Sequence, residues 1–156
     1  MQRTRFGDMP CSIARTWNVI GEPWSPLILR DIYVGVRRFD DLQASLGISR
    51  KVLAERLTWL VDQQVLDRHP YSDRPTRHEY VLTPRGVELC DALLVLARWG
   101  DRWLAGADGP PALFRHRSCG ATSHVTLHCS HCDQPMTASD VDVLDGPGAP
   151  AREETP

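Results

Sequence analysis

Lysine is almost absent from this chain of 156 residues, in which a single lysine stands beside seventeen arginines. The formal net charge is −2, so composition alone does not indicate a nucleic-acid partner. The chain also lacks an apolar run long enough to cross a membrane and an N-terminal segment that resembles a signal peptide. These absences predict a cytoplasmic location, where the five cysteines are expected as free thiols, redox sensors or metal ligands.

The part of the chain from residue 39 to residue 83 has the pattern of a winged helix-turn-helix. A helix is predicted over Phe39–Leu46, because its apolar residues recur at helical spacing. Gly47 suits the left-handed end of that helix, and Ser49 suits the N-cap of the next helix, Arg50–Gln64. This order of signals predicts two helices joined by a tight turn.

In a helix-turn-helix, the N-terminal part of the second helix enters the major groove of DNA. Arg50 and Lys51 stand at that end, where they can reach phosphates or the guanine acceptors. Ser49 and Arg56 complete the contacts predicted from this helix. On a lone amphipathic helix such residues would be ordinary solvated charges, but the adjoining turn and wing favour DNA.

The wing is predicted as two paired strands, Leu66–Tyr71 and Arg77–Leu82, because polar and apolar residues alternate in the second of them. The connection, residues 72–76, is rich in turn formers. Arg74 and Arg77 lie at the tip and base of this hairpin and are expected to contact the DNA backbone or minor groove. Without the preceding helices, the same segment would be a small solvent-exposed hairpin.

Three more helices are predicted around this motif: one over Cys11–Ile20, one that starts with Ser25 as N-cap and Pro26 as first residue, and one from Thr83-Pro84 to about residue 104. The last carries two apolar rows, one of Val87, Cys90, Leu94 and Ala97 and one of Leu89, Leu93, Leu96 and Trp103. One row can cover the protomer's own core, and the other is expected to face a second copy in a homodimer. A single wide buried face is the alternative.

The predicted fold is mainly α with a small β-wing (α+β), followed by a small C-terminal unit. Residues 1–104 form the winged helix-turn-helix and dimerisation domain, and residues 1–9 form an arm that carries Arg3 and Arg5. Residues 105–112 form a linker, residues 113–144 the small unit, and residues 145–156 a disordered tail. The sequence shows no internal repeat.

The small unit contains two pairs of metal-ligand type at x2 spacing, His116 with Cys119 and Cys129 with Cys132. These four N and S ligands match a closed structural zinc site in a zinc-ribbon-like unit, with a strand over residues 122–127 between the pairs. His124, His128 and His131 are competing ligands. A metal-free β-hairpin and a redox pair of Cys129 and Cys132 are the alternatives.

Six segments of the chain together resemble HxlR-type transcriptional regulators, over roughly residues 8–104. They are Cys11-Ser12-Ile13-Ala14-Arg15-Thr16-Trp17-Asn18-Val19-Ile20-Gly21, Trp24-Ser25-Pro26-Leu27-Ile28-Leu29-Arg30-Asp31, Arg37-Arg38-Phe39-Asp40-Asp41-Leu42, Gly47-Ile48-Ser49, Val52-Leu53-Ala54-Glu55-Arg56-Leu57 and Tyr80-Val81-Leu82-Thr83-Pro84-Arg85-Gly86. The resemblance implies a dimeric winged-helix repressor or activator. The chain departs from the family at Glu22-Pro23, where a Gly-Lys pair is usual.

The resemblance also implies that Cys11 senses oxidants or electrophiles. The predicted position of Cys11 in the first turn of a helix, with Arg15 one turn later, favours the thiolate. The alternative is that Cys11 is a small buried apolar residue, which is a common role for free cysteine.

The sequence therefore predicts a homodimeric regulator that binds a palindromic operator in double-stranded DNA and responds to a small-molecule or oxidant inducer. The two recognition helices are expected to meet half-sites about one DNA turn apart. The alternative function is a protein-interaction adaptor, which the near-neutral charge favours. An enzyme is not expected, because no glycine elbow, phosphate loop or paired-carboxylate pattern is present.

Overall fold

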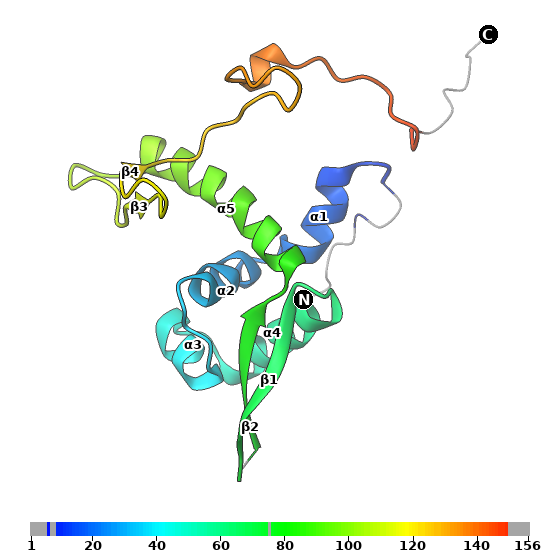
Figure 1. The fold of residues 1–156 in the computed structure, drawn as a ribbon. Helices are drawn as coiled ribbons and strands as arrows, with labels where there is room; N and C mark the ends of the chain where they lie inside the picture. The colour runs from blue at the N-terminus through cyan, green and yellow to red at the C-terminus, as the bar shows by residue number, and fades with distance from the viewer. Residues whose placement is uncertain (1–5, 7–8, 75, 150–156) are drawn as a thin grey trace. The chain divides into compact units, whose positions relative to one another are not determined.

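The computed structural model describes residues 6, 9–74 and 76–149 of the chain (Figure 1). Its helices are α1 (Ser12–Ile20), α2 (Trp24–Tyr33), α3 (Phe39–Leu46), α4 (Arg50–Asp62) and α5 (Pro84–Trp103), and its strands are β1 (Leu66–Asp73), β2 (Thr76–Leu82), β3 (Phe114–Arg115) and β4 (Thr122–Ser123). A short 3-10 turn, η1, covers Ala138–Asp140. The described residues divide into two compact units: residues 6 and 13–93 form the first, and residues 9–12 and 94–149 form the second. Helix α5 passes from the first unit into the second.

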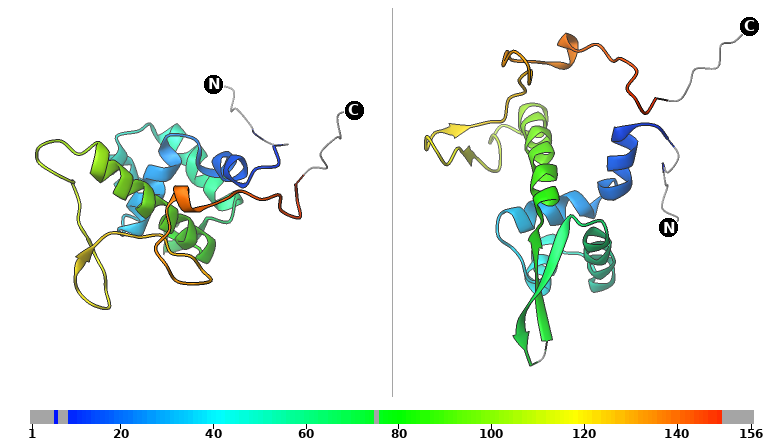
Figure 2. Two further views of the ribbon diagram at one scale, coloured as in Figure 1. Left: turned by 90° about the horizontal axis from the view of Figure 1, so that it is seen from above. Right: turned by 45° about the vertical axis from the view of Figure 1, so that its right-hand side comes forward.

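The first unit has the predicted architecture, which is mainly α with a small β-wing. Helices α2, α3 and α4 surround one apolar core at the base of the β1–β2 hairpin, and the hairpin extends beyond the helices (Figures 1 and 2). The largest side chains with no exposed surface are Ile28, Leu29, Leu42, Leu53, Leu57, Leu60 and Leu66. This core fixes the position of α4 relative to the wing.

The turn between α3 and α4 has the predicted geometry. Gly47 adopts the left-handed conformation, with φ 65°, and its N–H donates to the Gln43 carbonyl at 2.9 Å. Ile48 is buried between the two helices at 7% exposure. The Ser49 hydroxyl accepts a hydrogen bond from the Val52 N–H at 3.3 Å, which confirms Ser49 as the N-cap of α4.

The predicted start of α2 is wrong. The helix begins at Trp24 after Pro23, and Ser25 is a buried residue of its first turn, not its N-cap. The cap is supplied by Glu22, whose Oε2 accepts from the Trp24 N–H at 3.2 Å and from the Ser25 hydroxyl at 3.3 Å. Glu22, one of the two residues that depart from the family pattern, therefore provides the hydrogen-bond acceptor at the start of α2.

The long helix α5 begins at Pro84 as predicted, because the Thr83 hydroxyl accepts from the Gly86 N–H at 3.1 Å. The predicted division into a buried and an exposed row is wrong, since burial changes along the helix instead. Cys90 is buried, and Leu89 and Leu93 pack against the core, whereas the residues beyond Leu93 belong to the second unit. The exposed large apolar residues of α5 are Val87, Leu96, Trp99 and Trp103.

In the second unit, β3 pairs antiparallel with β4. The strand predicted over residues 122–127 is limited to Thr122–Ser123, because only these residues pair with β3. No helix among the described residues is long and apolar enough to span a membrane. Several predicted features lie outside the described residues: residues 1–5, 7 and 8 of the arm, with Arg3 and Arg5, the wing residue Pro75, and residues 150–156 of the tail.

Candidate nucleic-acid interface

The N-terminal end of α4 presents Arg50 on the surface, where α3 holds its side chain. The Arg50 Nη1 lies 2.8 Å from Asp40 Oδ1 and 3.1 Å from Gln43 Oε1. The guanidinium also stacks over the Phe39 ring at 4.7 Å from its centroid. Because the side chain is still 66% exposed, a phosphate or a base edge can reach it.

The wing is attached to the helix-turn-helix through the segment that precedes α3. Strands β1 and β2 pair from Leu66 opposite Leu82 to their tip, with an irregularity between Pro70 and Ser72. The Tyr80 N–H donates to the Arg37 carbonyl at 2.9 Å, so this segment runs along the outer edge of β2. The attachment gives the wing a defined position beside α4.

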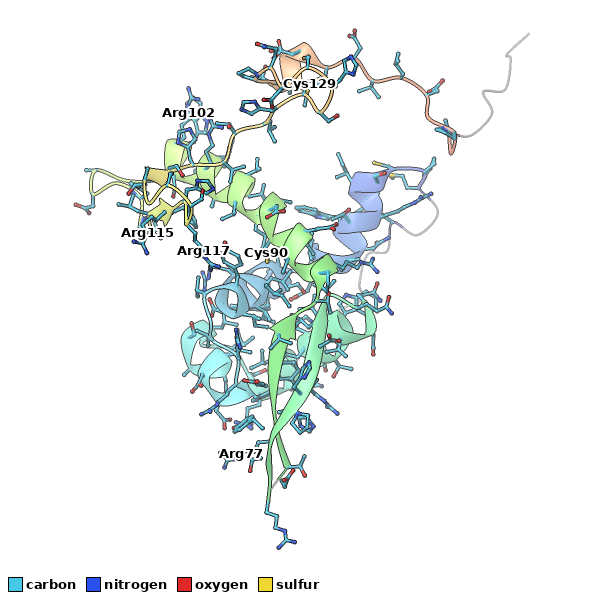
Figure 3. All side chains as sticks on the ribbon, in the orientation of Figure 1. Arg77, Cys90, Arg102, Arg115, Arg117 and Cys129 are labelled. Atoms are coloured by element: carbon cyan, nitrogen blue, oxygen red, sulfur yellow. The ribbon has the colours of Figure 1, made fainter. Side chains whose placement is uncertain are left out.

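Three arginines line one hollow between the wing and the helix-turn-helix: Arg38, Arg50 and Arg77. Arg77 pairs with Ser72 on the outer half of the hairpin (Figure 3), so its predicted place at the base of the hairpin is wrong. Arg38 stacks over the Tyr71 ring at 4.5 Å from its centroid. Arg38 was not among the residues predicted to contact DNA. Its signal in the sequence is a pair of arginines directly before the first helix of the motif.

The other predicted DNA contacts lie in different surroundings. Lys51 and Arg74 are exposed, on α4 and on the wing respectively. Arg56 points away from solvent, at 18% exposure, with its Nε 3.8 Å from Glu22 Oε2. Its charge is matched inside the fold by the carboxylate that starts α2, so Arg56 has little surface to offer to DNA.

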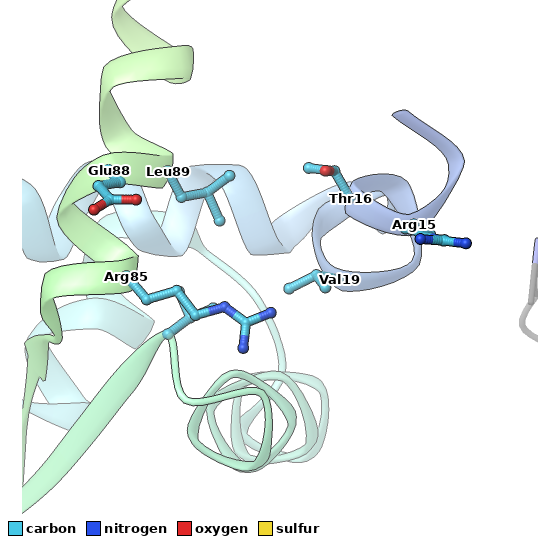
Figure 4. A pocket seen from close by; sticks show the side chains of 7 residues that line it. Arg15, Thr16, Val19, Arg85, Glu88 and Leu89 are labelled. Atoms are coloured by element: carbon cyan, nitrogen blue, oxygen red, sulfur yellow. The ribbon is translucent and has the colours of Figure 1, made fainter. Parts of the chain in front are cut away.

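A second hollow lies between α1, the start of β1 and the start of α5. The Arg85 side chain extends from α5 toward α1, where Val19 lies, and Leu89 adds apolar surface (Figure 4). Arg15 and Glu88 complete its charged rim. The arrangement combines an apolar wall with a cationic group, which suits a small anionic molecule with an apolar body.

The cysteines outside the small C-terminal segment have contrasting surroundings. Cys90 is buried at 3% exposure, and burial, assisted by the charge of Asp91, raises the pKa of its thiol. Cys11 is half-buried and immediately precedes α1, which starts at Ser12, so the predicted position in the first helical turn is wrong by one residue. Its N–H donates to the Met9 carbonyl at 2.8 Å. Of these two thiols, Cys11 is the accessible one.

The predicted zinc ligands are brought together as two separate pairs. His116 Nδ1 lies 3.3 Å from Cys119 Sγ. The backbone N–H groups of Cys132 and His131, and then the Cys132 side chain, lower the pKa of Cys129 by hydrogen bonding to its sulfur. In residues 9–74 and 76–149, no three His, Cys, Asp or Glu side chains converge as a metal site. The four-ligand zinc site stays a prediction.

Known proteins with similar sequences are transcriptional regulators. The family model of the HxlR-like helix-turn-helix matches residues 19–108. The chain is 45% identical over 141 residues to the HTH-type transcriptional regulator Rv3095 of Mycobacterium tuberculosis, which covers 90% of this chain and 89% of that protein. It is 28% identical over 105 residues to the HTH-type transcriptional regulator YodB of Bacillus subtilis, with 66% of this chain and 94% of that protein covered.

Solved structures agree with this assignment. PA1607, described as a transcription factor, superposes with a TM-score of 0.80 at 30% identity and covers 92% of this chain and 100% of its own. A transcription factor of Pseudomonas aeruginosa, PA1374, has a TM-score of 0.62 at 34% identity, with 90% of this chain and 95% of its own covered. The family match, the relatives and the shared winged helix-turn-helix show that this chain belongs to the HxlR-like family of helix-turn-helix transcriptional regulators.

Proposed function

We propose that this HxlR-type regulator works as a homodimer on a palindromic operator in double-stranded DNA, in the cytoplasm. The observation that supports DNA contact at this surface is the hollow lined by Arg38, Arg50 and Arg77. One arginine comes from α4, one from strand β2 of the wing and one from the segment directly before α3. Specific placement of a few arginines replaces the global positive charge that the chain lacks.

The dimer proposal rests on apolar side chains that the protomer leaves exposed on α5. Leu96, Trp99 and Trp103 are 53%, 57% and 63% exposed, and their spacing of three and four residues puts them on one face of the helix. A row of exposed aromatic residues favours a homodimer. In a two-fold dimer, this face of α5 in one protomer would pack against the same face in its partner, and both faces would be buried.

The dimer is tested by light scattering coupled to size-exclusion chromatography. Trp99→Glu places a charge in the proposed interface and is expected to give monomers at concentrations where the unmodified protein is dimeric. Val87→Glu is the matched control, because Val87 is also exposed, at 47%, but lies on the opposite side of the same helix. A Trp99→Glu protein that stays dimeric would refute this interface.

An inducer is proposed to act by changing the spacing of the two recognition helices. Two kinds of site are available for it: the accessible thiol of Cys11, and the hollow between α1 and α5 that Arg85 enters. Structures of the related YodB include a quinone-bound form, which has a TM-score of 0.52 to this chain at 26% identity, with 60% of this chain and 99% of its own covered. This likeness supports quinones as the first inducers to test.

DNA binding is tested by fluorescence anisotropy with duplex DNA from upstream of the chain's own gene and with a scrambled duplex of equal length. The proposal expects selective, salt-dependent binding to the first duplex. The adaptor alternative expects equal and weak binding to both. Selective binding that is lost on Arg77→Ala and kept on Arg115→Ala would assign it to the wing hollow.

A further inference from the structure

The C-terminal segment contains the same turn twice, thirteen residues apart in the sequence. In the first turn, the Gly120 N–H donates to the His116 carbonyl at 2.8 Å. In the second turn, the Asp133 N–H donates to the Cys129 carbonyl at 2.9 Å. The first predicted ligand of each pair therefore occupies the same place in its turn.

The hydrogen bonds that close the two turns repeat as well. The His116 N–H donates to the Ala121 carbonyl, and the Cys129 N–H donates to the Gln134 carbonyl, both at 2.9 Å. Strand pairing flanks each turn: β3 with β4 around the first, and a bridge between His128 and Pro135 around the second. The segment is thus a tandem repeat of two small hairpins, in which Cys119 and Cys132 match but most other equivalent side chains differ.

Each turn ends in a residue with left-handed backbone directly after its second predicted ligand. Gly120 has φ 72°, and Asp133 has φ 57°. This conformation costs an L-residue such as aspartate roughly 1 kcal/mol, so the second hairpin keeps it against a local preference. The result in both hairpins is a turn that brings residues i and i+3 to one side.

The side chains in each turn are arranged as a pair of potential ligands. His116 Nδ1 and Cys119 Sγ are 3.3 Å apart. In the second turn, Cys129 and Cys132 stand at the positions that His116 and Cys119 hold in the first turn. Each hairpin presents one half of a tetrahedral set.

An apolar core does not hold these hairpins. Among the described residues from 105 to 149, none is buried, and the only large apolar side chains that are even partly covered are Phe114, Val125 and Met136. A segment of this size without a core generally needs a disulfide or a metal to keep a defined fold. No disulfide joins the cysteines of this segment, which favours a metal.

We propose that the two hairpins close on one zinc ion, which takes His116 and Cys119 from the first hairpin and Cys129 and Cys132 from the second. No three of these side chains converge in the described part of the chain, so binding of one ion requires the two hairpins to approach each other. Binding converts three thiols into thiolates and releases their protons, while the imidazole binds in its neutral form. The site would be structural, since four protein ligands fill a tetrahedral zinc ion.

The repeat also selects among the competing histidines. Both ring nitrogens of His128 are engaged, Nδ1 with the Asp133 carbonyl at 2.9 Å and Nε2 with the Thr126 hydroxyl at 3.1 Å. His131 occupies the position that Ser118 holds in the first hairpin, which is not a ligand position. His116 is the histidine that corresponds to Cys129.

The test uses the full-length chain, purified under reducing conditions without added chelator, and measures metal content by plasma mass spectrometry and cobalt binding by absorption. We expect one zinc per chain, and cobalt spectra with the intense visible bands of a tetrahedral thiolate site. Cys119→Ser and Cys129→Ser are expected to lose the metal. His116→Cys is expected to retain the metal and to show stronger thiolate-to-cobalt charge transfer. If His116 only supported the fold of the hairpin and did not bind the metal, this spectral change would not occur.

His128→Ala and Cys90→Ser are the controls, and both are expected to keep one metal per chain. The proposal is overturned by folded protein without bound metal, by a disulfide between Cys129 and Cys132 in the reduced preparation, or by one metal shared between two chains. It is overturned equally if Cys119→Ser retains the metal, because the second hairpin alone would then be the site. DNA binding is not a readout in these measurements, so they do not depend on the proposed function.

Discussion

Replacing Arg50 by alanine removes the cationic group that we place against DNA at the start of α4. In the free protein its guanidinium is paired with Asp40 at 2.8 Å, and the two side chains are 66% and 69% exposed. A pair as exposed as this contributes only about 0.2–1 kcal/mol to stability. Arg50→Ala is therefore expected to leave the thermal midpoint nearly unchanged, so that any loss of binding is a loss of DNA contact.

The size of the binding effect follows from counterion release. Each phosphate contact contributes about 0.9 to the slope of log K against log salt, so losing one contact per protomer makes the slope of a dimer shallower by roughly 1.8. If Arg50 reads a guanine instead, the loss is about 1–3 kcal/mol per protomer and the slope changes little. The salt series thus separates a phosphate contact from a base contact.

Asp40→Asn is the informative partner variant, because it breaks the same ion pair but keeps the arginine. If Arg50 contacts DNA, Arg50→Ala weakens binding and Asp40→Asn strengthens it, since a competing carboxylate is gone. If the pair matters only for the fold, both variants shift binding in the same direction. Anisotropy titrations at several salt concentrations, with Arg115→Ala as an exposed-arginine control, distinguish these outcomes. Unchanged affinity and slope in Arg50→Ala would refute the placement of α4 in the groove.

Three further predictions concern the fold and the switch. Arg56→Ala leaves Glu22, at 22% side-chain exposure, without its cation, so urea titration is expected to show a loss of about 1–3 kcal/mol, with the salt dependence of DNA binding unchanged. Gly86→Ala puts a methyl group 2.2 Å from the Val65 carbonyl oxygen and is expected to lower the free energy of unfolding by about 1–3 kcal/mol. Gly100→Ala is the control in the same helix: its methyl group would have no other atom within 4 Å, and it is expected to raise the free energy of unfolding by roughly 0.5–1 kcal/mol. Cys11→Ser is expected to abolish the release of DNA by diamide, whereas Cys90→Ser retains it; release that persists in Cys11→Ser excludes the thiol switch.

The helix-turn-helix was predictable because its signals are local. Gly47 ends one helix and Ser49 starts the next within a few residues, and both act through the backbone beside them. The same holds for Thr83 at the start of α5. Where a residue caps the helix directly beside it, apolar periodicity and capping preferences are sufficient to predict the helix boundary.

The start of α2 and the role of Arg56 could not be predicted in this way, because both depend on Glu22. Its carboxylate caps α2 in place of Ser25 and pairs with an arginine on α4, which is a contact between segments distant in the sequence. The periodicity of α4 places Arg50 and Arg56 on one predicted helix. It does not reveal that the segment before α2 packs against the Arg56 side chain. A lone acidic residue before a helix carries no sequence signal of such a partner.

The two equivalent hairpins of the C-terminal segment could not be predicted from the sequence for a different reason. The repeat consists of backbone hydrogen bonds and left-handed residues, whereas most side chains at equivalent positions differ, with His116 matching Cys129 and Gly120 matching Asp133. The spacing of the ligands was visible, but the equivalence of the two turns required the structure.

The most direct test of a dimeric regulator on a palindromic site is selection of bound duplexes from random DNA, followed by footprinting and by the mass of the complex. We expect an inverted repeat whose half-sites lie about one helical turn apart, with two chains per duplex and protection over both half-sites. Recovery of no common sequence, or of a single half-site bound by one chain, would contradict it.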